Sequence, residues 1–310
     1  MSKKVLVVGS FIVDIATYTP RFPVNGESVI GSSVKFGPGG KGSNQAVAAK
    51  RAGADVTMIT KVGKDFLSRI LYDFYKEEGI GLDYVFESDT AETGSAVIEI
   101  NEATGENRII VITGANSEIT GEEVLSAEKE FAASDIILTQ LESSDISVIE
   151  AKRLAKKYNK PIIINTAPMR AVPDDFFEGV DYITPNETEA EFFSGVHVET
   201  IDDAKLAAKK LLEKGVKNVI ITLGKNGAFY TNGTMEYHVP ALLVKPVDTT
   251  GAGDSFNGGF AVGIAEGMDV LSAMRFANCL ASLKVTRKGT SKAMPTRAEI
   301  DELYKKNFKN

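Results

Sequence analysis

The sequence predicts an α/β protein with a doubly wound, mostly parallel sheet flanked by helices and a small β-sheet lid. Short runs rich in valine and isoleucine alternate with longer segments in which apolar residues recur at helical spacing. Two further stretches resemble strands but leave no room for helices between them. The 310 residues, 43% of them hydrophobic, are enough for a large core, and we expect one α/β domain over residues 1–310.

The core elements follow one another in a regular order. The expected core strands lie at residues 5–9, 56–60, 135–140, 161–165, 182–184 and 218–223. The expected helices between them lie at residues 42–52, 66–78, 121–132, 146–158, 187–194 and 201–214. Strands joined by such helices run parallel. Two long apolar helices rich in alanine and glycine are expected between residues 253 and 288.

Two insertions, at about residues 15–37 and 92–114, interrupt this order. In the second, Ala96-Val-Ile-Glu-Ile100 and Arg108-Ile-Ile-Val-Ile112 surround a polar turn, as in a β-hairpin. Because both insertions leave the core and return to it, we expect a lid over the carboxyl ends of the core strands, where such sheets bind ligands. An antiparallel extension of the core sheet is the alternative. Open lid edges usually need covering, so we expect a homodimer through the lid.

The charge balance excludes two classes of partner. The net charge of −7 offers no basic surface for nucleic acid or for an anionic membrane. The longest uncharged stretch, between Asp254 and Glu266, is too short to span a bilayer. The single cysteine, Cys279, excludes an internal disulfide and indicates a cytoplasmic location. His197 and His238 lack a metal-binding pattern, and we expect both at the surface.

The segment Val247-Asp-Thr-Thr-Gly-Ala-Gly-Asp-Ser-Phe-Asn-Gly-Gly-Phe260 predicts an anion-binding helix start. Gly251, Ala252 and Gly253 allow a ligand to approach the backbone, and the free N–H groups of the following helix favour negative charge. Asp254 is either an ordinary stabilising charge in the first turn or a base that takes a proton from an attacking hydroxyl. Its neighbours favour the catalytic interpretation.

A second glycine-rich segment, Phe36-Gly-Pro-Gly-Gly-Lys-Gly-Ser-Asn44, precedes the first helix. It is not a Walker loop, and it lacks the strand and the acidic residue of a dinucleotide fingerprint. It does place two hydrogen-bonding side chains where a polyhydroxylated ligand could bind. Lys41 is a hydrogen-bond donor, and Asn44 can both donate and accept.

Three motifs, in this order, resemble the ribokinase family of carbohydrate kinases over essentially the whole chain. They are Gly39-Gly-Lys-Gly-Ser-Asn44, Thr184-Pro-Asn-Glu-Thr-Glu-Ala-Glu191 and Asp248-Thr-Thr-Gly-Ala-Gly-Asp254. Gln140-Leu-Glu142, Ile221-Thr-Leu-Gly-Lys-Asn-Gly227 and Val285-Thr-Arg-Lys-Gly289 resemble the ribose-specific members more than nucleoside or fructose 6-phosphate kinases.

The resemblance implies transfer of the ATP γ-phosphate to O5 of D-ribose, giving D-ribose 5-phosphate. Asp254 would be the general base, and the amides of Gly251, Ala252 and Gly253 would stabilise the transferred group. The implied sugar-binding residues are Asp14, Gly40, Lys41, Gly42, Asn44, Glu142 and Asp254. The implied ATP-binding residues are Asn186, Thr222, Leu223, Gly224, Lys225, Asn226, Gly227, Gly253 and Asn278. Mg²⁺ would lie near Asn186 and Glu189.

One departure from the family concerns the sugar. Ile12 stands where ribokinases of the best-known type carry an asparagine, two residues before the sugar-binding Asp14. An apolar side chain leaves a sugar hydroxyl unpaired, which favours 2-deoxy-D-ribose. Residues 15–19 also resemble deoxyribokinases. The other motifs favour ribose. Ribose is therefore slightly ahead, and both ribokinase and deoxyribokinase activity remain open.

A second departure concerns the monovalent cation, K⁺, that the resemblance implies beside the anion hole. Its ligands would come from Asp248, Thr250 and the backbone near Lys284, Arg287 and Gly289, with a final serine at the position of Ala293. A methyl group cannot bind an ion, so Ser291 or water would have to complete the shell. We nevertheless expect activation by K⁺.

Two other functions are compatible with the sequence. A nucleoside kinase would need a flat apolar contact for the base. A sugar-binding regulator that lost catalysis would release no ADP. The intact Asp254 and glycine loop argue against such a regulator.

Overall fold

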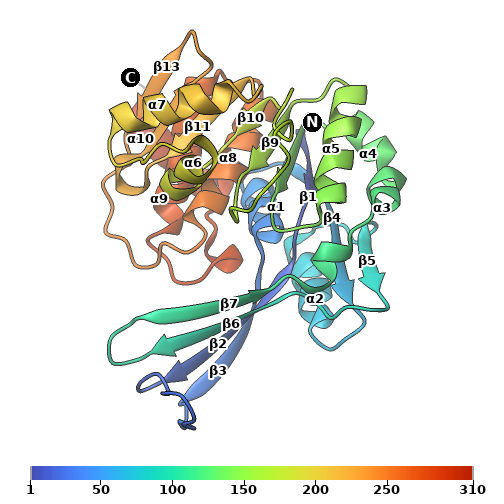
Figure 1. Cartoon of the computed structure of the whole chain (residues 1–310), viewed down its shortest axis with the longest axis vertical. Coiled ribbons are helices and arrows are strands. Elements are labelled where there is room, and N and C mark those ends of the chain that lie inside the picture. The colour runs from blue at the N-terminus through green and yellow to red at the C-terminus, as the bar shows by residue number, and fades with distance from the viewer. Residues whose placement is uncertain (1, 309–310) are drawn as a thin grey trace.

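The computed structural model describes residues 2–308, and its larger sheet has nine strands (Figure 1). They are β1 (Lys4–Val8), β4 (Asp55–Gly63), β5 (Val85–Ser88), β8 (Ile136–Gln140), β9 (Ile162–Asn165), β10 (Tyr182–Ile183), β11 (Asn218–Thr222), β12 (Ala228–Thr231) and β13 (Glu236–Val239). Their order is β13-β12-β11-β10-β9-β8-β1-β4-β5. The strands from β5 across to β11 pair in parallel, whereas β12 and β13 are antiparallel.

Helices cover both faces of this sheet. They are α1 (Lys41–Arg51), α2 (Ser68–Glu78), α3 (Gly121–Ser126), α4 (Glu128–Ala133), α5 (Asp145–Lys157), α6 (Glu187–Ser194), α7 (Ile201–Leu212), α8 (Ala252–Ala265), α9 (Val270–Lys284) and α10 (Arg297–Phe308). Short 3₁₀ turns are η1 (Gly114–Glu118), η2 (Gly224–Asn226) and η3 (Ser291–Ala293).

Successive residues of β1 enter different apolar clusters, because side chains alternate across a strand. Val5 and Val7 pack with α1, α2, α8, α9 and α10, whereas Leu6 and Val8 pack with the helices from α3 to α7. The predicted doubly wound α/β fold is therefore confirmed.

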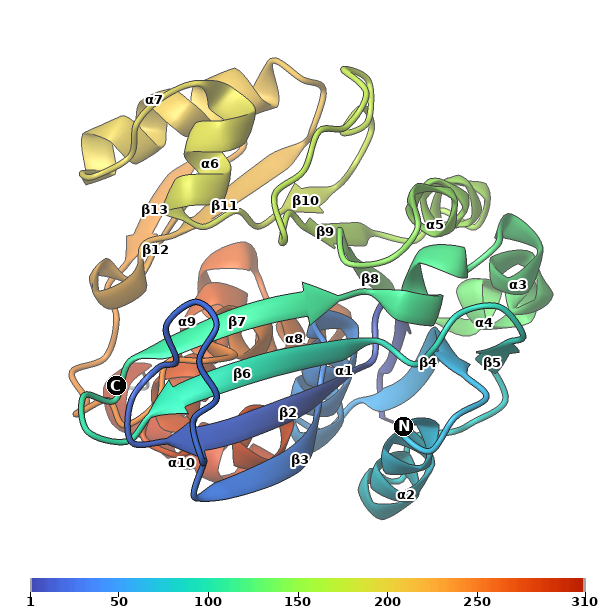
Figure 2. The same cartoon turned by 60° about the horizontal axis from the view of Figure 1, so that its bottom comes forward.

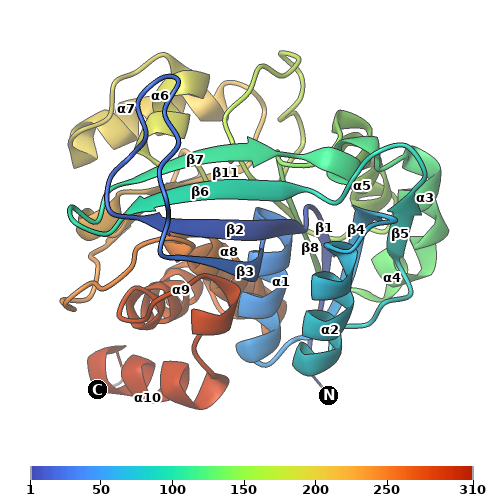
Figure 3. The ribbon, with the colours of Figure 1, turned by 90° about the horizontal axis from the view of Figure 1, so that it is seen from below.

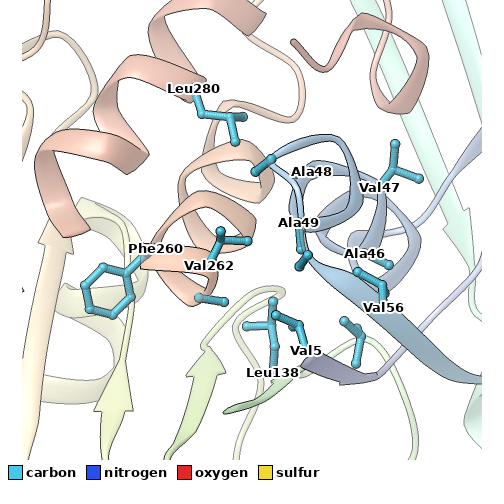
Figure 4. Close-up of a cluster of buried hydrophobic side chains, with 14 of the residues drawn as sticks. Val5, Ala46, Val47, Ala48, Ala49, Val56, Leu138, Phe260, Val262 and Leu280 are labelled. Atoms are coloured by element: carbon cyan, nitrogen blue, oxygen red, sulfur yellow. The ribbon is translucent and has the colours of Figure 1, made fainter. Parts of the chain in front are cut away.

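Helices α1 and α8 pack closely because small residues line their contact (Figure 4). A Cβ atom on Gly258 would lie 2.5 Å from Cβ of Ala48 and 2.7 Å from the carbonyl oxygen of Gln45. This close approach brings the start of α1 beside the first turn of α8.

The second sheet has four strands in the order β3-β2-β6-β7. They are β2 (Ile12–Thr19), β3 (Ser33–Gly39), β6 (Ser95–Asn101) and β7 (Asn107–Ile112), and they lie side by side in Figure 2. Seen from below, they run across the lower end of the core (Figure 3). The separate lid sheet is confirmed, and it is not an extension of the core sheet.

Several boundaries differ from those expected. Strand β2 begins at Ile12, and residues 20–32 contain no strand. The helix expected over residues 121–132 is two helices, divided at Ala127. Strands β5, β12 and β13 were not foreseen. No helix among residues 2–308 is long and apolar enough to cross a membrane.

Candidate active site

Polar residues converge at the carboxyl ends of the parallel strands, beside the first turns of α1 and α8. Strand β1 has β4 on one side and β8 on the other, and open α/β sheets bind ligands where the strand order reverses in this way. A cleft of about 170 Å³ lies there. Its lining residues are Lys41, Asn165, Ala167, Thr184, Asn186, Glu189, Thr222, Thr249, Gly251, Ala252, Gly253, Asp254 and Asn257.

The carboxylate of Asp254 is held by two side-chain amides of α1. Its Oδ2 accepts a hydrogen bond from Nδ2 of Asn44 at 2.9 Å, and its Oδ1 accepts one from Nε2 of Gln45 at 3.0 Å. The same Gln45 nitrogen donates to Oδ1 of Asn165, and Nε2 of Gln140 donates to Oε1 of Gln45. Asp254 is only 7% exposed.

No role at the site was predicted from the sequence for Gln45 or for Gln140, although Gln140 belongs to one of the family-like motifs. The sequence does contain a signal for Gln45. The four residues after it are alanine and valine, which indicates a buried helix, and a polar side chain on a buried helix needs hydrogen-bond partners.

The start of α8 offers backbone donors to the cleft. Gly251 is its N-cap, with φ 77°, and no side chain caps the helix. The amide of Ala252 donates to the carbonyl of Thr249 at 3.1 Å, whereas among the described hydrogen bonds the amides of Gly251, Gly253 and Asp254 have no acceptor. Free amides at a helix start bind anions.

A second polar group surrounds the start of α1. Oε2 of Glu142 accepts hydrogen bonds from Oγ of Ser10 at 2.6 Å and from the amide of Lys41 at 2.8 Å. Gly40 has φ 87°, and a Cβ there would lie 2.6 Å from the amide nitrogen of Ile12. The loop therefore requires glycine at this position.

Acidic side chains outnumber basic ones in this region. Burial, together with repulsion from Glu142 and Asp254, raises the pKa of Asp14 to about 6. Burial also raises the pKa of Glu142 and of Glu189. Burial alone would lower the pKa of Lys41, but attraction to Asp254, Glu142 and Glu189 raises it. The ligand-free site therefore has an excess of negative charge that a bound cation would relieve.

Ile12 and Asp14 share one face of β2, since side chains alternate along a strand. Val13 and Ile15, on the opposite face, pack into the core, whereas Ile12 is 2% exposed and absent from both apolar clusters of the described residues. The apolar side chain thus lies beside Asp14 on the face directed at the polar site.

The residues assigned to ATP and Mg²⁺ fall into two groups. Asn186 caps α6, and the carboxylate of Glu189 accepts hydrogen bonds from Asn186 and from Oγ1 of Thr166 at 2.9 Å. Thr222 forms a bridge to Asn186 at the cleft.

Residues 224–226 form the exposed turn η2, and Gly227 follows at φ 89°. Asn278 lies outside the cleft lining, and its Nδ2 donates to the carbonyls of Val239 and Pro240, each at 3.2 Å. Its described contacts are to the chain itself, and its contact with ATP stays a prediction.

The residues assigned to the monovalent cation have other partners. The carboxylate of Asp248 accepts hydrogen bonds from the amides of Thr250 and Gly289, each at 2.9 Å. Partial burial alone would raise the pKa of Asp248, but these hydrogen bonds lower it. Arg287 pairs with Glu299, and the side chain of Ala293 is a buried methyl group.

Lys284 is fully buried, and its Nζ lies 3.0 Å from the carbonyl oxygen of Asp248. Burial lowers the pKa of Lys284, while attraction to Asp248 and Asp254 opposes that shift.

Comparison with known proteins identifies the class. The model of the pfkB family of carbohydrate kinases matches residues 2–297, and the chain belongs to this family. It is accordingly an ATP-dependent phosphotransferase.

The similar proteins include both ribokinases and deoxyribokinases. The chain is 39% identical over 301 residues to the ribokinase of Bacillus subtilis (strain 168), covering 97% of this chain and 99% of the relative. It is 37% identical over 304 residues to the deoxyribokinase of Salmonella typhi, covering 98% and 99%. Among solved structures, the Arabidopsis thaliana ribokinase complexed with ribose and ATP superimposes with a TM-score of 0.91 at 30% identity, covering 98% and 99%.

Proposed function

We propose that this kinase transfers the γ-phosphate of ATP to O5 of a pentose, with D-ribose as the leading substrate and 2-deoxy-D-ribose as the alternative. The observation that carries the proposal is the carboxylate of Asp254, which lines one cleft with Lys41 and the free amides of a helix start and is close enough to Asp14 and Glu142 to raise their pKa values. Both candidate sugars occur among the names of the similar proteins.

In the proposed reaction, Asp254 accepts the proton of the attacking sugar hydroxyl. Asn44 and Gln45 fix its two oxygens, so the base does not have to reorganise during the reaction. The free amides of Gly251 and Gly253 stabilise charge on the transferred group. The ammonium of Lys41 adds a positive charge among the surrounding carboxylates.

Mg²⁺ fits the described residues. Asn186 and Glu189 bring amide and carboxylate oxygens to the cleft that also receives the amides of α8. These are oxygen ligands of the kind that Mg²⁺ prefers, and Mg²⁺ is usually held by one or two carboxylates together with phosphates and water. When bound, it would neutralise phosphate charge and the excess acid of the site.

The monovalent cation fits the described residues less well than Mg²⁺ does, because Ala293 has a methyl group where the last ligand is expected.

The position of Ile12 supports 2-deoxyribose as an alternative. An apolar side chain beside Asp14 leaves a sugar hydroxyl without a partner, whereas a deoxy carbon loses nothing there. Overall similarity does not separate the sugars, because the two named relatives have nearly equal identity.

A lid-to-lid homodimer is part of the proposal. Strands β3 and β7 are the open edges of the lid sheet, and Ile109, Ile110, Val111 and Ile112 on β7 are all at least half exposed. Apolar strand edges of this kind call for a partner.

Steady-state release of ADP with ribose, 2-deoxyribose and ribonucleosides tests the function, with Asp254→Asn as the catalytic control. We expect turnover with a pentose and a loss of about 10²-fold or more in kcat for the variant. Turnover with ribonucleosides alone would indicate a nucleoside kinase. Pentose binding without ADP release would indicate a regulator.

A further inference from the structure

The loop before α8 and the loop after α9 lie side by side. The amides of Val247 and Asp248 both donate to the carbonyl of Val285, at 2.7 and 3.1 Å, and the amide of Gly289 donates to the Asp248 carboxylate. The first loop leads directly into Gly251 and the free amides of α8. Whatever holds these loops together also sets the position of the anion-binding helix start.

A positive charge already lies at this junction. The Nζ atom of Lys284 donates to the carbonyl oxygen of Asp248 at 3.0 Å, and the lysine is 0% exposed. A buried ammonium is retained only where acceptors and negative charges compensate it. Here the carbonyl of Asp248 accepts a hydrogen bond from the ammonium, and the nearby carboxylates of Asp248 and Asp254 offset part of the cost of its burial.

The side chains expected to complete a shell for a free ion are not available for it. Ala293 presents a buried methyl group, and the hydroxyl of Ser291 donates to Oδ1 of Asn44. An ion about 4 Å from the ammonium would be bound about a thousandfold more weakly because of charge repulsion.

We propose that the ammonium of Lys284 is a built-in substitute for the monovalent cation, and that this kinase works without K⁺. The lysine supplies one fixed positive charge between the two loops, where a monovalent ion would otherwise supply it. The activity part of this inference rests on the proposed kinase function, but ion binding is measurable without turnover.

The experiment compares wild type, Lys284→Ala and Lys284→Ala/Ala293→Ser, in KCl or in tetramethylammonium chloride at about 0.1 M total salt. Because tetramethylammonium is too large for a site formed by backbone carbonyls, the exchange changes the available ion but not the ionic strength. Both kcat and the Tm of the sugar-free protein are measured. Lys288→Ala, which removes an exposed lysine of the same loop, is the matched control.

We expect KCl to change neither kcat nor Tm for wild type and Lys288→Ala. Lys284→Ala should lose about tenfold or more in kcat without K⁺. The double variant, which regains a hydroxyl ligand, should recover activity and gain Tm in KCl only.

Activation of the wild type by K⁺, or a rise in its Tm in KCl alone, would overturn the proposal. So would a folded double variant whose kcat and Tm both ignore K⁺. If no sugar is phosphorylated by the wild type, the proposed function fails, while the Tm comparison still decides whether Lys284 replaces an ion.

Discussion

Ile12 is the residue on which the choice between the two pentoses depends. It shares a strand face with Asp14 and packs in neither apolar cluster of the described residues, so replacing it should change the sugar site more than the core. We expect Ile12→Asn to raise the ratio of kcat/KM for ribose over 2-deoxyribose by about tenfold, because a paired hydroxyl contributes about 1–2 kcal/mol. An unchanged ratio in a folded variant would refute this role for Ile12.

Asp14 should make sugar binding and stability depend on pH in opposite directions. Its pKa is raised from 3.8 to about 6, so the stability associated with its protonated form is present below about pH 3.8 and is lost as the pH rises through 6. The KM for sugar should increase below about pH 6, because a protonated carboxyl is a poorer acceptor for sugar hydroxyls.

Asp14→Asn should therefore weaken sugar binding but raise the Tm of the sugar-free protein at pH 8 more than at pH 5. A difference of about 2 °C or more is expected from about 1 kcal/mol. Differential scanning calorimetry at the two pH values measures it. Asp83→Asn, which removes an exposed carboxylate, is the control, and equal shifts for both variants would contradict the prediction.

At the scale of elements, the contact between α1 and α8 sets the geometry of the base. Gly258→Ala would bring a methyl group to 2.5 Å from Ala48 and 2.7 Å from the carbonyl of Gln45, so the helices must separate. Overpacking of this kind costs about 1–3 kcal/mol, which corresponds to a fall in Tm of several degrees. Because Asn44 and Gln45 move with α1, kcat should fall as well.

Thermal unfolding and steady-state kinetics test this prediction. Gly37→Ala is the control for stability, since nothing lies within 4 Å of its added methyl group. A Gly258→Ala protein as stable and active as wild type would show that the contact is not restrictive.

The elements predictable from the sequence are those with strong periodicity. The six core strands appear close to their expected limits, because most of them are buried runs rich in β-branched residues. Strands β12 and β13 were missed although Asn232-Gly233 between them is a hairpin signal, because each has only four residues.

The residues around Asp254 are a different case. Asn44 was assigned from a motif, whereas Gln140 reaches Gln45 only through the fold, from 95 positions away.

At the scale of the molecule, the lid predicts the oligomeric state. Val34 on edge strand β3 is 53% exposed, and Ile110 on edge strand β7 is 66% exposed. We expect light scattering to give twice the chain mass of 33.3 kDa for wild type and the single mass for Val34→Lys/Ile110→Lys. Phe66→Lys, at an apolar residue 70% exposed on the core, should remain dimeric. A monomeric wild type would contradict the proposed lid-to-lid dimer.

The long span of the hydrogen bonds around Asp254 also determines when the protein becomes active during its synthesis. Asn44 leaves the ribosome 210 residues before the carboxylate it binds, and Ser291, which donates to Asn44, follows 247 residues after it. At about 5–20 residues per second, the interval to Asp254 is about 10–40 s. During that time the first strands can form while the base has not yet been made. A nascent chain that ends before Asp254 therefore has no general base and cannot consume ATP, and turnover can begin only after Asp254 and Ser291 have been translated.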